Sequence, residues 1–297
     1  MQYTSKNCAL YHGDCTEVIK SIPSDSVHLI ISSFPFANLY TYSDDLRDYS
    51  NVKDLEQYFK QLDYLIPELY RVTVPGRDIC LHVKQIPKFK GRDGHIGLID
   101  FRGMMIQAFQ KHGWIYWDDI DIWTDPEIEA LRTKASTIIY KTYRTAAENT
   151  RTGMQDILII MKKWSDDANT HVTHGYKDDI EYEQNRKLWS KIASPCWFDI
   201  NRMNVLNAKL AKDEKDEKHM TPLQLDLIGR LIEWRTNEGE IVMDPFNGVG
   251  SVTYEAVKHK RKGLGIELKQ SYFEQSIKYM KELEDDSQIN IFDMLES

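Results

Sequence analysis

The chain has 297 residues, of which 41% are hydrophobic and 28% are charged, and its formal net charge is −8. This length and composition are typical of a soluble globular protein built as one large α/β domain, with or without an insertion. No apolar run approaches the ~18 residues that span a bilayer, and residues 1–6 lack a signal-peptide core. These features argue against a membrane-spanning or secreted protein and predict a cytoplasmic location.

The cysteines and the charged residues narrow the possible partners. Cys8, Cys15, Cys80 and Cys196 include no CxxC pair, so neither a disulfide framework nor a metal site is predicted. Residues 132–163 contain seven basic side chains and two acidic ones, which suits a polyanion. A second basic cluster, from Lys84 to Arg92, lies on a predicted loop, and either cluster is also compatible with ordinary solvated surface. The candidate phosphate contacts are Lys88, Lys90, Arg92, Arg132, Lys134, Lys141, Arg144 and Arg151.

The first half of the chain alternates between predicted strands and helices. Residues 8–12 form a short strand that ends in Gly13 and Asp14, and residues 25–32 form a buried strand after a short helix over 17–21. A loop is predicted over 40–51, and Pro75 and Gly76 close the helix that follows it. The predicted helices cover 55–72 and 101–112, and the predicted strands cover 78–83, 114–123 and 154–161. This alternation predicts a parallel sheet covered on both faces, with the last two strands paired antiparallel at one edge.

The strand over 25–32 leads directly into Ser33, Phe34, Pro35 and Phe36. A small polar residue, a proline and an aromatic at the carboxyl end of a strand lie where open α/β sheets bind ligands. This tetrapeptide is therefore one candidate site. Taken alone, Ser33 is also compatible with a strand-end cap and Phe36 with a core aromatic.

The regular pattern weakens from residue 164 to 218, where charged and aromatic residues dominate and the run 213–218 indicates a solvated helix or linker. We interpret this region as an inserted recognition segment. A helix is predicted from His219 to about Trp234, with apolar residues on one face. A final amphipathic helix is predicted over about 271–283.

A glycine-rich loop between a strand and a helix forms the second candidate site. The strand 240–243 is followed by the sequence DPFNGVGS over residues 244–251 and by a helix over 252–258. Glycines let the backbone approach a nucleotide-like ligand. Glu267, at the end of the next predicted strand, is placed to bind a ribose hydroxyl. A nicotinamide dehydrogenase is disfavoured because the third glycine of GxGxxG is missing, and an ordinary strand-turn-helix corner is the plainer alternative.

Together, these motifs and their order resemble the β-class DNA amino-methyltransferases, the phage and prophage enzymes included. In that family a catalytic S/D/N-P-P-Y/F/W motif precedes a recognition segment, and the S-adenosylmethionine loop D-P-F-x-G-x-G-S comes last. SFPF over 33–36 and DPFNGVGS over 244–251 follow this order, and HMTPLQLDLI over 219–228 resembles the helix before the cofactor strand. The resemblance implies a circularly permuted S-adenosylmethionine-dependent methyltransferase fold, with a mostly parallel sheet of the seven-stranded type and helices on both faces.

The resemblance implies three regions and a set of functional residues. Residues 1–163 are the catalytic half, 164–218 the target-recognition insertion and 219–297 the cofactor-binding half. Ser33 and the carbonyl of Phe34 accept hydrogen bonds from the target amino group, and Phe36 stacks on a flipped base. The implied cofactor-binding residues are Asp14, His219, Thr221, Pro222, Asp244, Pro245, Phe246, Asn247, Gly248, Gly250, Ser251 and Glu267. Asp14 is equally compatible with a helix N-cap.

Several alternatives stay open within this resemblance. Serine at the head of the motif favours cytosine N4 over adenine N6 as the target. Phe34 replaces the first of two family prolines, which removes a fixed φ near −65° and places a phenyl group where it could crowd the target base. A catalytically weak or inactive DNA-binding regulator is therefore the non-enzymatic alternative. The resemblance implies double-stranded DNA as the partner, in a bacterial or phage-infected cell, and leaves open a cognate restriction nuclease and a homodimer.

Overall fold

The computed structural model describes residues 1–35, 55–88, 90–126, 156–167, 172, 178–211 and 222–295. Its side chains are described up to residue 285, apart from those of 209 and 210. Of the residues with predicted roles, Phe36, His219, Thr221, Arg132, Lys134, Lys141, Arg144 and Arg151 lie outside the described residues, as do the loop 40–51 and the run 213–218.

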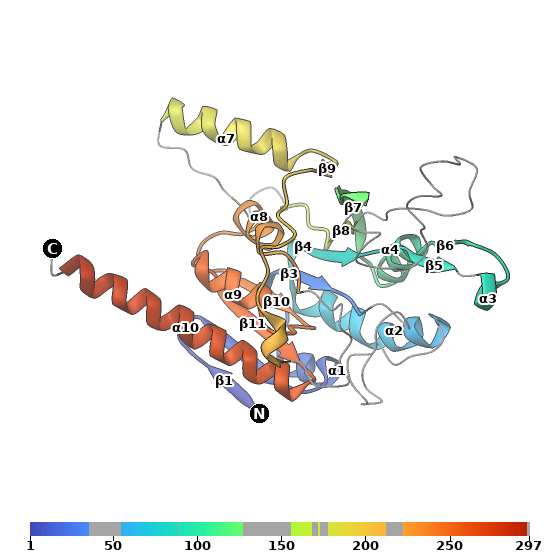
Figure 1. Cartoon of the computed structure of the whole chain (residues 1–297), viewed down its shortest axis with the longest axis horizontal. Helices are drawn as coiled ribbons and strands as arrows, with labels where there is room; N and C mark the ends of the chain where they lie inside the picture. The colour runs from blue at the N-terminus through green and yellow to red at the C-terminus, as the bar shows by residue number, and fades with distance from the viewer. Residues whose placement is uncertain are drawn as a thin grey trace.

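A single large sheet forms the centre of the protein (Figure 1). Its strands in spatial order are β1 (Gln2–Thr4), β2 (Cys8–His12), β11 (Lys262–Glu267), β10 (Ile241–Asp244), β3 (Val27–Ser33), β4 (Thr73–Val83), β8 (Asp156–Lys162), β7 (Ile115–Ile122) and β9 (Cys196–Trp197). The five strands from β2 to β4 run parallel, and β8 pairs antiparallel with both β4 and β7. The predicted antiparallel pairing of the segments 114–123 and 154–161 is therefore confirmed.

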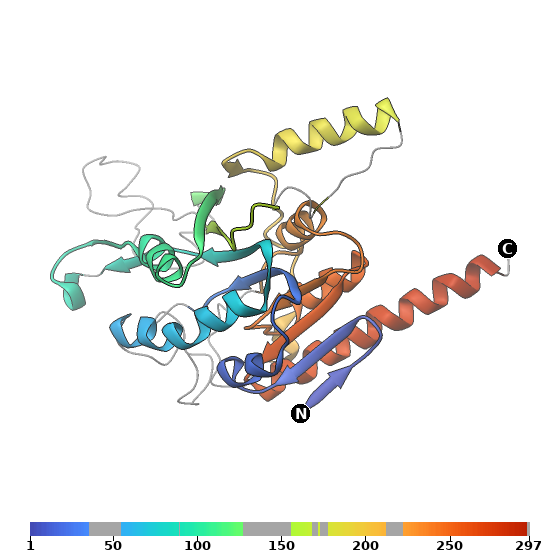
Figure 2. The ribbon, with the colours of Figure 1, turned by 180° about the vertical axis from the view of Figure 1, so that it is seen from behind.

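Helices cover both faces of this sheet (Figures 1 and 2). Alternate residues of a strand point to opposite faces, so Ile30 and Leu81 pack on one side while Leu29 and Cys80 pack on the other. The first side is covered by α1 (Cys15–Val18), the 3-10 turn η1 (Ile19–Ser21), α2 (Leu55–Val72) and α4 (Phe101–Lys111). The second is covered by α8 (Leu225–Arg235), α9 (Ser251–Lys258) and α10 (Gln270–Leu295).

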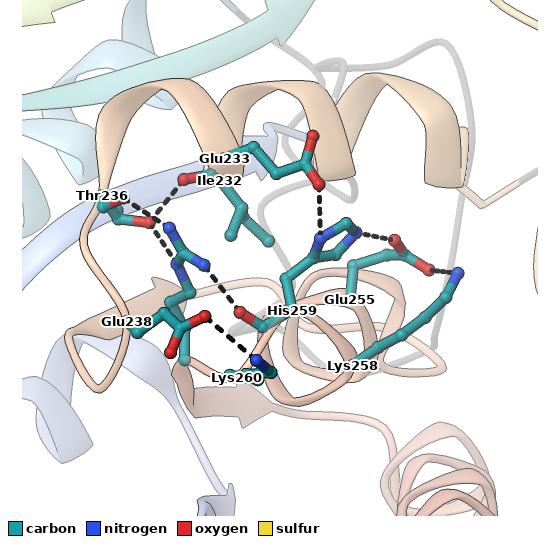
Figure 3. Close-up of polar contacts among 9 residues, drawn as sticks. Ile232, Glu233, Thr236, Glu238, Glu255, Lys258, His259 and Lys260 are labelled. Atoms are coloured by element: carbon teal, nitrogen blue, oxygen red, sulfur yellow. Dashed lines mark hydrogen bonds and ion pairs between the residues drawn. The ribbon is translucent and has the colours of Figure 1, made fainter. Parts of the chain in front are cut away.

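Polar contacts join α8 to α9 (Figure 3). His259, which follows α9, contacts Glu233 of α8 through Nδ1 at 3.1 Å and Glu255 of α9 through Nε2 at 3.0 Å. Glu255 is almost fully buried and also pairs with Lys258 at 2.9 Å. The imidazole of His259 therefore links α8 to α9 on one face of the sheet.

Two small units lie outside the main layers. β5 (Ile86–Lys88) and β6 (Gly97–Ile99) form a two-stranded ribbon around the one-turn helix α3 (Lys90–Asp93). Lys88, Lys90 and Arg92 were expected on a loop and lie instead on this ribbon and its short helix. The helix α7 (Asp179–Ile192) projects from the sheet (Figure 1), and a 3-10 turn, η4 (Ala208–Ala211), follows it.

The remaining differences from the sequence prediction concern the ends of elements. β4 starts at Thr73, earlier than predicted, and includes Pro75 and Gly76. This first part of β4 pairs irregularly with β3, because the register shifts between Val27 and Leu29. α8 begins at Leu225 after an extended Gln224, later than predicted, and α10 continues beyond 283. Among the described residues, no helix is both long and apolar enough to cross a membrane.

Candidate active site

The two predicted motifs meet at the carboxyl ends of neighbouring parallel strands. β10 ends at Asp244 and β3 ends at Ser33, and β10 pairs with β3 through Val242 and Met243. From this pair the chain continues in opposite directions, to β11 on one side and to β4 on the other. Such a reversal of strand order leaves a crevice in which open α/β sheets bind ligands.

A hydrogen bond connects the residue before SFPF to the start of the glycine-rich loop. The hydroxyl of Ser32 donates to Oδ1 of Asp244 at 2.7 Å, and both side chains are buried. The same carboxyl oxygen accepts the backbone N–H of Phe246 at 2.9 Å. Ser33, which follows Ser32, is thereby fixed next to the loop that begins at Asp244.

The glycine-rich loop is held in shape by backbone bonds and positive φ angles. Gly248 and Gly250 have φ of 53° and 95°, conformations that favour glycine. The N–H of Asn247 donates to the carbonyl of Ile266 at 2.8 Å, which anchors the loop to β11. Gly265 is needed there, because a Cβ on it would lie 2.5 Å from Cγ of Asn247.

Glu267 lies at the carboxyl end of β11, as predicted. Its Oε2 accepts the N–H of Gly248 at 2.7 Å and its Oε1 accepts the N–H of Lys269 at 2.7 Å. Each carboxylate oxygen has two lone pairs. The side chain therefore braces the loop and retains acceptor capacity for a hydroxyl group.

Ser251 opens α9 with a hydroxyl that has no hydrogen-bond partner among the described residues. The side chain is 5% exposed. Buried polar groups are rarely left unpaired, and the first N–H groups of a helix attract negative charge. This position fits a ligand carboxylate, such as that at the methionine end of S-adenosylmethionine.

Burial has a strong effect on Asp244. Desolvation raises the pKa of its carboxyl from 3.8 to about 7, although the hydrogen bonds from Ser32 and Phe246 act in the opposite direction. A positive charge in the crevice would favour the ionised form. The loop is therefore suited to a cationic ligand such as a sulfonium.

On the other side of the crevice, Ser33 contacts a histidine that the sequence did not single out. Ser33 Oγ lies 3.1 Å from Nδ1 of His82, its register partner on β4. Nε2 of His82 lies 3.8 Å from Oδ2 of Asp156 at the start of β8. The only signal in the sequence for His82 is its place near the end of the strand after the SFPF motif.

Asp156 is 1% exposed and lies between positive side chains. Lys84 Nζ is 2.7 Å from its Oδ1, and Arg202 is 3.2 Å from its Oδ2. Burial alone would raise the pKa of Asp156, but His82, Lys84 and Arg202 outweigh burial and hold the pKa below its usual range. Lys84 is thus partly buried and paired with Asp156, whereas the sequence grouped it with the second basic cluster.

Phe34 does not face the crevice. Its side chain is fully buried, with ring centroids 5.8 Å from Phe109 and 5.1 Å from Phe246. The expectation that its phenyl could crowd a target base is therefore wrong, because the ring fills the core beneath the loop. The next carbonyl, of Pro35, accepts the hydroxyl of Tyr58 at 2.8 Å and is fixed by α2.

Four other predicted cofactor residues have clear positions. Asp14 caps α1, because its Oδ1 accepts the N–H of Thr16 at 2.9 Å. Asp14 also follows Gly13, whose N–H donates to the carbonyl of Glu267, so it lies beside the β11 end of the crevice. Pro222 precedes α8, and Pro245 and Phe246 follow β10 as predicted.

Among the described residues, no cluster of side chains fits a metal ion.

The strand order and the crevice together define an open α/β protein with a ligand site at the reversal of its strand order. Comparison with known families gives the closer identity. Residues 27–278 match the model of the N6/N4 DNA methylase family. The chain therefore belongs to this family, whose cofactor is S-adenosylmethionine, and its fold is the circularly permuted form, with the SFPF strand preceding the cofactor loop.

Known relatives and solved structures agree with this assignment. The type II methyltransferase M.BamHI of Bacillus amyloliquefaciens is 25% identical over 87% of this chain, and M.BslI of a Bacillus species is 28% identical over 90%. The chain spans 54% of the former and 27% of the latter. TTHA0409 of Thermus thermophilus, in complex with S-adenosyl-L-methionine, aligns over 92% of this chain and 93% of its own, with a TM-score of 0.64 and 20% identity. The cytosine-N4-specific PvuII DNA methyltransferase aligns over 95% and 92%, with a TM-score of 0.63 and 18% identity.

Proposed function

We propose that the protein transfers a methyl group from S-adenosylmethionine to an exocyclic amino group of a base in double-stranded DNA. The observation that carries this proposal is the Ser32–Asp244 hydrogen bond, which holds Ser33 beside the glycine-rich loop. The hydrogen bond thereby brings the proposed acceptor, Ser33, close to the cofactor loop. A methyl-transfer reaction requires this proximity, because the amino nitrogen and the methyl donor must meet in one crevice.

The role proposed for Ser33 follows from the chemistry of the amino group. The nitrogen lone pair of cytosine or adenine is delocalised into the ring, so the amino group is a poor nucleophile. Ser33 Oγ and the carbonyl of Phe34 accept its two N–H groups and let the nitrogen become pyramidal. Phe34 keeps this carbonyl role while its ring is buried, which supports an active enzyme over an inactive regulator.

On the cofactor side, we propose that the loop from Asp244 to Ser251 holds the methionine end. When bound, S-adenosylmethionine supplies the methyl group on a positive sulfonium. Asp244 offers a buried carboxyl for that charge, and Ser251 offers its unpaired hydroxyl to the carboxylate. Glu267 accepts a ribose hydroxyl and Asp14 faces the adenine. His219, Thr221 and Pro222 complete the methionine side.

Cytosine N4 is the target that we favour, with adenine N6 as the alternative. The basis is Ser33 at the head of the motif, since a serine there resembles the cytosine-specific members. Both bases present an amino donor beside a ring nitrogen, so the choice is left to the product analysis below. The target base is proposed to be rotated out of the duplex and stacked on Phe36.

The three regions are proposed to divide these tasks. Residues 1–163 carry the catalytic motif, 164–218 read the DNA sequence and 219–297 bind the cofactor. The side chains proposed to contact DNA phosphates are Lys88, Lys90, Arg92, Arg132, Lys134, Lys141, Arg144 and Arg151. Of these, Lys88 and Lys90 lie on the β5–α3 unit, and Arg92 also pairs with Asp93. Loss of the charges of Lys88 and Lys90 should reduce the salt dependence of DNA binding by about one phosphate each, and an unchanged slope would contradict their role. A cognate nuclease, a homodimer and a cytoplasmic location are compatible with this proposal.

The test is transfer of label from S-adenosylmethionine to methyl-free DNA, followed by digestion to nucleosides. Because the recognition sequence is undefined, the probe is long amplified DNA of mixed sequence. Label on N4-methylcytosine is expected from the natural chain, and Ser33→Ala should reduce it by at least about 100-fold. Label on N6-methyladenine would overturn the choice of base alone. No label, with cofactor and DNA both still bound, would overturn the proposed enzyme.

A further inference from the structure

Three polar side chains from three neighbouring strands form a line behind the proposed target site. Ser33 ends β3, His82 lies near the end of β4, and Asp156 begins β8. Ser33 Oγ and His82 Nδ1 are 3.1 Å apart, and His82 Nε2 and Asp156 Oδ2 are 3.8 Å apart. His82 is 7% exposed and Asp156 is 1% exposed, so neither is an ordinary surface side chain.

The surroundings of His82 select one tautomer of its ring. Nε2 lies 3.8 Å from the carboxylate of Asp156, beyond hydrogen-bond distance, and has no hydrogen-bond partner among the described residues. A proton on Nε2 is attracted to this carboxylate, whereas a lone pair there would be repelled by it. With the proton on Nε2, Nδ1 is an acceptor, and the hydroxyl of Ser33 must donate to it.

This arrangement matters because a hydroxyl is both a donor and an acceptor. If the hydrogen of Ser33 pointed into the crevice, it would oppose the N–H of a target amino group. When that hydrogen is donated to His82, only the lone pairs of Ser33 Oγ face the crevice. Ser33 then becomes the pure acceptor that the proposed reaction needs.

We infer that His82, oriented by Asp156, is a positioning residue that turns the Ser33 hydroxyl hydrogen away from the target amino group and receives the proton released by methyl transfer. This inference rests on the proposed function. It extends that function beyond the SFPF motif to two residues on other strands. It also gives a reason for two buried ionisable side chains that lie beside the crevice.

The proton balance can be followed atom by atom. When the amino nitrogen bonds to the methyl carbon, the carbon–sulfur bond breaks and its electron pair stays on sulfur. The nitrogen then carries a positive charge and one proton in excess. That proton passes to Ser33 Oγ as the original Ser33 hydrogen passes to Nδ1 of His82. The products are a neutral methylated amine and an imidazolium next to the Asp156 carboxylate, and the imidazolium later releases its proton to water.

Charged groups keep the carboxylate at the end of this line ionised. Lys84 and Arg202 contact the oxygens of Asp156, so they hold this carboxylate in its ionised form and in place. The two ring nitrogens of His82 lie beside Ser33 from β3 and Asp156 from β8. Arg202, which also contacts Thr124, comes from the segment proposed to read DNA.

The first experiment measures single-turnover methyl transfer to amplified methyl-free DNA at one fixed pH. His82→Asn keeps an acceptor near the position of Nδ1 but cannot take a proton, so we expect a rate at least about 100-fold lower with unchanged binding of cofactor and DNA. An unaltered rate would overturn the inference.

A matched control and a second readout make the test decisive. His112, which follows α4 and lies 2.7 Å from Asp63 of α2, gives the control His112→Asn, for which unchanged kinetics are expected. Nitrogen-15 NMR of the imidazole rings, with His82→Asn for assignment, reports the tautomer independently of activity. A proton on Nε2 supports the inference, and a proton on Nδ1 overturns it. A natural chain with the Nε2 tautomer but no methyl transfer would contradict the proposed function alone.

Discussion

The rings of Phe34 and Phe246 pack edge to face, with centroids 5.1 Å apart. Phe34 comes from the SFPF motif and Phe246 from the glycine-rich loop, so one aromatic contact joins the two motifs beneath the crevice. The Ser32–Asp244 hydrogen bond adds a second link, from the residue before SFPF to the start of the loop. The phenylalanine that interrupts the family's consecutive prolines is therefore part of the support for the loop.

Removal of the Phe34 ring should weaken both the fold and the loop. Phe34→Ala is expected to lower the free energy of unfolding by about 3–5 kcal/mol and to weaken cofactor binding, because Phe246 loses its neighbour. Phe34→Pro restores the two prolines but also removes the ring, so it should destabilise as well. The control is Phe198→Ala, at a residue that is 68% exposed. Equal stability of Phe34→Ala and the control in urea unfolding would contradict this role of the ring.

Gly265 should not tolerate a side chain. A Cβ there would lie 2.5 Å from Cγ of Asn247, and Asn247 is buried and held by Thr253 at 3.1 Å. Gly265→Ala should therefore displace the loop, with a loss of about 1–3 kcal/mol of stability and a weaker affinity for S-adenosylmethionine in calorimetry. Gly91→Ala, where no atom lies within 4 Å of the new Cβ, should leave both unchanged. Normal cofactor affinity of Gly265→Ala would show that the loop shape is not needed.

Much of this architecture was predictable from local patterns. Residues 55–72 carry an apolar stripe at helical spacing, and the structure has a helix with those bounds. The buried strand before Ser33 and the glycine loop after Met243 were predictable because continuous apolar runs and glycines are strong local signals. Each motif was predicted at the carboxyl end of a strand, and the structure shows that these two strands are neighbours.

The partners across the sheet were not predictable in the same way. His82 belongs to a strand that reads as ordinary core, and Asp156 begins another strand more than seventy residues later. Only the register of β3, β4 and β8 brings them to Ser33. The direction of the Phe34 ring also depended on the core around Phe109 rather than on its neighbours in sequence. The helix α7 was missed because it is polar and only Ile192 is buried.

Cofactor binding should depend on pH through Asp244. The pKa of this buried carboxyl is raised to about 7, so it is largely protonated at pH 6 and largely ionised at pH 8. If the positive sulfonium lies beside it, binding favours the ionised form and releases a proton. The affinity for S-adenosylmethionine should therefore rise from pH 6 to 8. Calorimetry in buffers of different ionisation enthalpy measures this proton, and Asp244→Asn should abolish it. A pH-independent affinity would place the sulfonium away from Asp244.

The imidazole of His259 should make stability depend on pH in the alkaline range. Hydrogen bonds to Glu233 and Glu255 raise the pKa of His259 from 6.5 to about 9 (Figure 3). Because the folded pKa is raised, the stabilisation is complete below about pH 6.5 and is lost as the pH rises through about 9. After allowance for solvent screening, we expect about 1–2 kcal/mol. The difference in unfolding free energy between the natural chain and His259→Gln should shrink from pH 6 to 10, and a constant difference would contradict this role.

The most direct test of the central claim is the identity of the labelled nucleoside. The protein is incubated with S-adenosylmethionine labelled in the methyl group and with amplified methyl-free DNA, and the DNA is then digested and separated. We predict label in N4-methylcytosine and its loss in Ser33→Ala, which should still bind the cofactor. Unlabelled DNA from a natural chain that binds both cofactor and DNA would contradict the claim.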